Sequence, residues 1–94
     1  MSDVRVTQSH DLPVDEAVER VTEFEDMIKK YGVKSTWKGG HADLKGMGVK
    51  GSIDVTDSDV TVVLKLGMMA KAAGVDPKRL EGSIRKRLAA AFED

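Results

Sequence analysis

The order of its apolar patterns constrains the fold of this chain more than any single motif does. Apolar residues recur at spacings of three and four over residues 14–31, alternate with polar residues over residues 34–66, and return to helical spacing over residues 80–92. The outer two patterns predict amphipathic helices, and the alternation between them predicts strands with one buried face. With a short strand expected around residues 4–6, the predicted order is β-α-β-β-β-α.

Three or four strands are expected between the two helices. Gly39-Gly40 and the polar residues 56–59 mark turns. The last strand has the clearest alternation, since a slip of one residue would place Thr61 and Lys65 in the core. Its expected core residues are Val60, Val62, Leu64 and Leu66. We therefore expect an α+β fold in which an antiparallel sheet carries both helices on one face.

The helix ends are marked by residues suited to them. Pro13 fits the first turn of the first helix, and Gly32 fits its C-terminal cap. Asp76 is expected to cap the second helix, with Pro77 at its first position. These local signals set the expected limits of both helices.

Length and charge restrict the classes of protein to consider. The 94 residues favour a single domain over residues 1–94, with a core thin enough that a homo-oligomer is a further option. The formal net charge is -1, so an electrostatic partner would meet one face and not the whole molecule. The chain has no cysteine, which excludes thiol chemistry and zinc–thiolate sites. No apolar run could span a bilayer and no secretory signal is visible, so we expect a cytoplasmic protein.

Three patterns suggest chemistry, but each has a stronger structural interpretation. His10 beside Asp11 could be a general base with its orienting acid, yet both belong to the polar segment before the first helix. His10 and His41 lack the spacing of a zinc site, so no metal is expected. Residues 46–51 match G-x-G-x-x-G, but strand residues follow them where a dinucleotide site needs a helix. We expect a bend or bulge at these glycines, no cofactor and no enzymatic activity.

Two groups of residues could instead form a binding surface. Met68 and Met69, with Trp37 as an additional contact, would suit a protein partner or a hydrophobic particle if exposed. Alternatively, the methionines close the end of the core. The second group is a basic run that could bind RNA phosphates or form a solvated helix face: Lys78, Arg79, Arg85, Lys86 and Arg87. No aromatic pair suited to stacking bases lies on a strand, which disfavours nucleic acid.

Several short stretches occur together in an order typical of one bacterial family. They are Ser9-His10-Asp11-Leu12, Asp15-Glu16-Ala17, Tyr31-Gly32, Thr36-Trp37, residues 48–55, residues 64–67 and residues 81–84. Over about residues 4–92 the chain resembles the polyhydroxyalkanoic acid system proteins, also called granule-region proteins. The resemblance implies a link to polyester storage and supplies no catalytic residues. The segment 69–78 departs from the family pattern by being longer and more polar.

Taken together, residues and resemblance predict a non-catalytic accessory or granule-associated protein of polyhydroxyalkanoate storage. Its partner would be a polyester granule or a granule-associated protein, contacted through Met68, Met69 and Trp37. The alternative is a small RNA- or ribosome-binding protein that uses the basic face of the last helix. Affinity should fall steeply with salt in the second case and weakly in the first.

Overall fold

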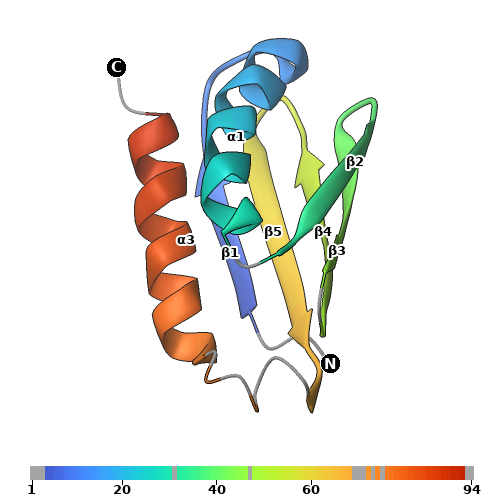
Figure 1. Ribbon diagram of the computed structural model, residues 1–94. Coiled ribbons are helices and arrows are strands. Elements are labelled where there is room, and N and C mark those ends of the chain that lie inside the picture. The colour runs from blue at the N-terminus through green and yellow to red at the C-terminus, as the bar shows by residue number, and fades with distance from the viewer. Residues whose placement is uncertain are drawn as a thin grey trace.

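The strands and helices follow in the expected order. The computed structural model of the protein describes residues 4–30, 32–46, 48–68, 72, 74 and 76–92, and only the backbone of residues 23–28. Its elements are β1 (Val4–Ser9), α1 (Val14–Lys29), β2 (Lys34–Lys38), β3 (His41–Gly46), β4 (Val49–Val55), β5 (Asp59–Leu66) and α3 (Pro77–Ala91) (Figure 1). Four strands thus lie between the two helices, and the α+β prediction is confirmed.

The strands form one antiparallel sheet in the order β1-β5-β4-β3-β2. Strands β2 to β5 are joined to their chain neighbours as hairpins, and β1 pairs with the distant β5. Both helices lie on the same face of the sheet, with α3 beside β1 and α1 next to α3 (Figure 1). In the part of the chain that the structure describes, no helix covers the opposite face, which we call the open face.

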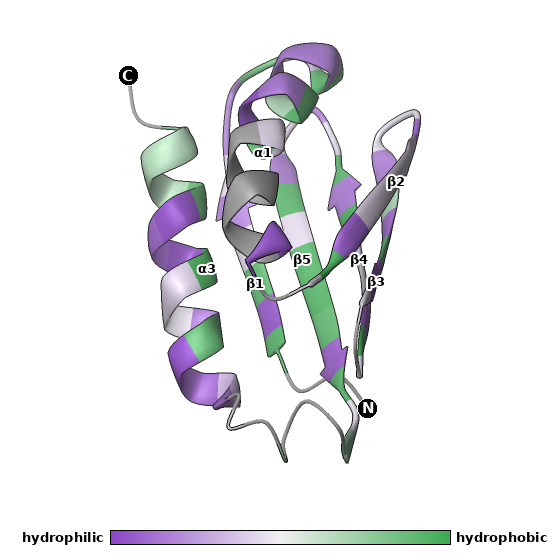
Figure 2. Cartoon of the chain, in the orientation of Figure 1, coloured by the Kyte–Doolittle hydropathy of each residue, from purple (hydrophilic) through white to green (hydrophobic). Residues whose placement is uncertain are grey.

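The core lies between the sheet and the two helices. Val60, Val62, Leu64 and Leu66 are buried as expected, while Lys65 faces away from the core. The helices contribute Ala17, Val21, Leu80, Ile84 and Leu88 to the same core. In Figure 2 the apolar residues of α3 lie on the side facing α1 and β1, and its hydrophilic residues lie on the outer side. Burial of this stripe fixes the helix on the sheet.

The ends of the helices follow the local signals in the sequence. Asp76 caps α3, because its carboxylate accepts a hydrogen bond from the Lys78 backbone N–H at 3.0 Å, and Pro77 begins the helix. Gly32 has the positive φ of 74° expected at a helix C-terminus. Helix α1 ends at Lys29, whereas the expected end at Tyr31 lies outside the described residues.

The glycines of the G-x-G-x-x-G motif lie at the β3–β4 hairpin: Gly46 ends β3, Gly48 lies in the turn and Gly51 belongs to β4. Gly46 pairs with Val49, and Gly48 has a φ of 71°, which favours glycine. Pairing of β4 with β5 then runs without interruption from Val49 to Val55. The expected bend is therefore this hairpin turn, with no bulge in β4. A strand follows the motif, as the sequence indicated, so its glycines do not open a helix over a dinucleotide.

Candidate functional site

Met68 is exposed at the end of β5. Its side chain is 89% accessible, by far the most exposed large apolar side chain among the described residues. It therefore does not close the core, which was the alternative interpretation of this segment. Met69 lies outside the described residues. Met68 follows Gly67, the first residue after β5. Gly67 lies beside the β3–β4 hairpin turn, because its backbone N–H donates a hydrogen bond to the Gly48 carbonyl.

Trp37 lies elsewhere in the molecule. Its side chain faces the helices, is half-buried and packs against the core. Cross-strand pairing places it level with Val62 of β5, and Leu66 is four residues further along that strand, about 13 Å at a rise of ~3.3 Å per residue. Because Met68 follows Leu66, the structure does not bring Trp37 and Met68 into one patch.

The basic residues of α3 lie outside its buried stripe of Leu80, Ile84 and Leu88. All five side chains are exposed, but they are spread around the helix and do not share one face: Lys78, Arg79, Arg85, Lys86 and Arg87. Arg85 also contacts Glu81 one turn earlier, at 3.4 Å. Exposed basic residues on a helix are compatible with simple solvation and with binding of an anionic partner.

The two histidines lie on different faces of the sheet and do not converge. The His10 ring stacks on Phe92 with centroids 5.0 Å apart, and its Nδ1 accepts a hydrogen bond from the Leu12 backbone N–H at 3.0 Å. His10 thus joins the end of β1 to the end of α3, on the helix side. Its Nδ1 is occupied by this backbone contact and not by Asp11, the partner considered from the sequence.

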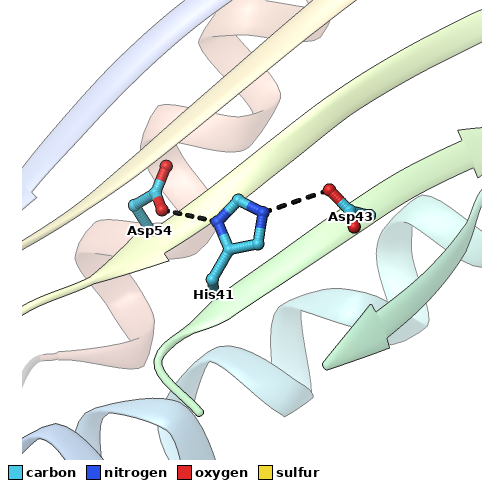
Figure 3. Close-up of polar contacts among 3 residues, drawn as sticks. All are labelled: His41, Asp43 and Asp54. Atoms are coloured by element: carbon cyan, nitrogen blue, oxygen red, sulfur yellow. Dashed lines mark hydrogen bonds and ion pairs between the residues drawn. The ribbon is translucent and has the colours of Figure 1, made fainter. Parts of the chain in front are cut away.

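His41 lies on the open face between two carboxylates. Its Nδ1 is 2.6 Å from Asp54 Oδ1, and its Nε2 is 3.1 Å from Asp43 Oδ1 (Figure 3). The hydrogen bond to Asp54, followed by that to Asp43, raises the pKa of His41 above its usual value. This group was not predicted from the sequence, because only the cross-strand pairing of β3 and β4 brings Asp54 opposite His41.

A row of four lysines crosses the open face, and it was not predicted from the sequence either. Lys34, Lys45, Lys50 and Lys65 lie on β2, β3, β4 and β5, and each is the direct cross-strand partner of the next. All four are exposed. We call this set the lysine row. The positions of Lys45 and Lys50 on either side of the glycine turn were the only signal that could have suggested it.

A cavity of about 300 Å³ opens alongside the lysine row, on the side of the β3–β4 hairpin turn. Three of the lysines contribute to its wall, and most of the remainder is glycine backbone: Lys45, Lys50, Lys65, Gly46, Gly48, Gly67 and Val49. Met68 directly follows this wall in the chain. The end of the sheet that carries Met68 is therefore also basic and hollowed.

Comparison with known proteins agrees with the family resemblance. Residues 4–92 match the family model described as "Putative polyhydroxyalkanoic acid system protein". No curated protein matches the chain significantly. No helix among the described residues is long and apolar enough to cross a membrane. Since the match spans nearly the whole chain, this protein belongs to the polyhydroxyalkanoic acid system protein family.

Proposed function

We propose that this protein is a non-catalytic accessory protein of polyhydroxyalkanoate storage that binds the granule surface in the cytoplasm. The contact is the end of the sheet at which Met68 is exposed. The family supplies the link to polyhydroxyalkanoate, and the 89% exposure of Met68 is the observation that supports this contact. A flexible, unbranched methionine suits an irregular apolar surface.

The expected contribution of Met68 is large enough to measure. Full burial of a methionine side chain stabilises a complex by roughly 1.5–3 kcal/mol, which corresponds to about a tenfold or greater change in affinity. Replacing Met68 and Met69 by Asp removes this gain and adds charges that resist transfer to an apolar surface. Because Met68 is exposed and outside the core, the Met68 substitution leaves the fold intact.

Co-sedimentation with protein-free polyhydroxyalkanoate particles tests this proposal. We expect the wild-type protein to sediment with the particles and Met68→Asp/Met69→Asp to remain in solution, with unchanged thermal unfolding. Val14→Asp is the matched control, since Val14 is the other exposed large apolar residue described and begins α1, where an acid is tolerated. Binding by the double variant would overturn the proposal. Binding only to native granules still coated with protein would instead identify a protein partner.

The alternative function is RNA or ribosome binding through the outer surface of α3. The observation in its favour is the exposure of all five basic side chains on one helix. This function requires an affinity for RNA that falls steeply with salt and is lost when Arg85, Lys86 and Arg87 are replaced by Gln. Granule binding through Met68 should survive both changes.

A further inference from the structure

The lysine row concentrates positive charge without balancing it. Neighbouring strands lie about 4.8 Å apart, so the four lysines extend over about 14 Å in a direction perpendicular to the strands. Like charges directly opposite each other in a sheet are destabilising. Three such pairs follow one another here. This arrangement lowers the stability of the folded chain. A bound anion would offset the repulsion and would explain why the four lysines lie together.

The acidic side chains of the open face do not neutralise this charge. Within the described part of the chain, none of the four lysines forms an ion pair with a carboxylate. Asp43 lies two residues from Lys45 on the same strand, but its carboxylate contacts His41 (Figure 3). Asp54 contacts the same histidine from the other side. Both acids therefore belong to a separate cluster nearer the opposite end of the strands.

The glycines beside the lysine row leave room for a ligand. Gly48 and Gly67 are joined by a backbone hydrogen bond of 2.6 Å, and neither has a side chain to fill the space beyond the lysines. The resulting cavity of about 300 Å³ lies at the lower end of the range for small-molecule pockets. Three lysines line it from three successive strands: Lys45, Lys50 and Lys65. A compact anionic group fits both the volume and the charge.

We propose that this cavity binds a linear oligophosphate group, as carried by a nucleoside triphosphate or by free inorganic triphosphate. Three lysines whose backbone positions span about 10 Å across neighbouring strands match a chain of anionic groups better than a single phosphate. Lysine binds phosphate as a point charge, so recognition needs no particular base or sugar. The inference is independent of granule binding, although both sites lie at the same end of the sheet.

Two larger anionic partners fit this site less well. An anionic membrane is flat, and contact with the open face would press Asp43 and Asp54 against it. A single-stranded nucleic acid gains affinity from bases stacked on aromatic side chains. Among the described residues of the open face, the only ring is that of His41, which is held by the two acids.

Isothermal titration of the full chain with inorganic triphosphate at low ionic strength tests the proposal. We expect saturable binding that Lys50→Gln weakens about tenfold, since a charged hydrogen-bond partner is lost from the centre of the row. Lys38→Gln is the matched control, because Lys38 lies on the open face of β2 but outside the lysine row. Backbone NMR should locate the shifts at Gly46, Gly48 and Gly67.

Further ligands separate the sources of phosphate from other classes of partner. Equal affinity for ATP and triphosphate supports recognition of the oligophosphate alone, and tighter binding of ATP supports a nucleotide. Absence of triphosphate binding overturns the proposal, as does binding that Lys50→Gln leaves unchanged or that shifts α3 resonances instead. Lys50-dependent binding confined to an oligothymidylate or to phosphatidylglycerol vesicles also overturns it, in favour of a nucleic acid or a membrane.

Discussion

Removing the charge of Lys50 should stabilise the protein. Lys50 is the direct partner of Lys45 on β3 and of Lys65 on β5, so it has a like charge on both sides. Lys50→Gln keeps a long polar side chain on the exposed face and removes both repulsions at once. Few surface substitutions are expected to raise stability in a predictable direction, and this one follows directly from the strand register.

The expected gain can be estimated from the spacing. Two unit charges about 6 Å apart in water repel by roughly 0.7 kcal/mol, and ~0.1 M salt, with a Debye length of about 10 Å, reduces this to about 0.4 kcal/mol. Cross-strand pairs measured in sheets fall in the same range, about 0.2–1 kcal/mol each. The two neighbours of Lys50 together give a gain of about 0.8 kcal/mol. In ~1 M salt, with a Debye length of about 3 Å, most of this gain should disappear.

Urea denaturation at two salt concentrations measures this effect. Lys50→Gln should raise the midpoint in low salt without changing the slope, and a gain of this size corresponds to a rise of a few °C in Tm. Lys38→Gln should give no gain, because Lys38 faces His41 and not another lysine. A destabilised Lys50→Gln protein, or a gain that persists unchanged in 1 M salt, would refute like-charge repulsion as the cause.

Three further predictions test the open face, the core and a helix end. NMR titration should give His41 a pKa above 6.5, and Asp54→Asn should lower this pKa more than Asp43→Asn. The reverse order would contradict the shorter hydrogen bond of His41 to Asp54. Because this pKa is raised by folding, the stabilisation is complete below pH 6.5 and is lost as the pH rises through the folded-state value. Ile84→Ala should cost about 2–5 kcal/mol in denaturant unfolding, since Ile84 is fully buried, and a cost below about 1 kcal/mol would mean that α3 packs differently. Asp76→Ala should cost about 1 kcal/mol by the same measurement, and no loss would show that the cap is not formed.

Local patterns in the sequence determined the parts of the fold that could be predicted. The start of α3 followed from Asp76-Pro77, because a cap depends on residues within one helical turn. The buried face of β5 followed from strict alternation, because a slip would bury Lys65. Each of these features depends on residues close together in the chain.

Features that depend on pairing between strands were not predicted. The lysine row joins residues that are 11, 5 and 15 positions apart, and it exists only when three neighbouring strand pairs have one particular register. The pairing of β1 with β5 joins residues 50 to 60 positions apart. The basic residues of α3 lie within ten positions of one another in the sequence, so they could be recognised before the fold was known. The basic surface made by four strands had no comparable linear signal.

The distribution of charge on the open face argues that the lysine row has a function of its own. Placing an acid opposite any of the four lysines would convert a repulsive pair into an attractive one. The face does carry acids, yet Asp43 and Asp54 both contact His41 and leave the lysines unbalanced. Charges of opposite sign are thus kept apart on a surface where mixing them would stabilise the sheet. Residues that destabilise the fold beside an open cavity are typical of a binding site. The repulsion among the four lysines is therefore a stronger indication of function than the number of basic residues on α3.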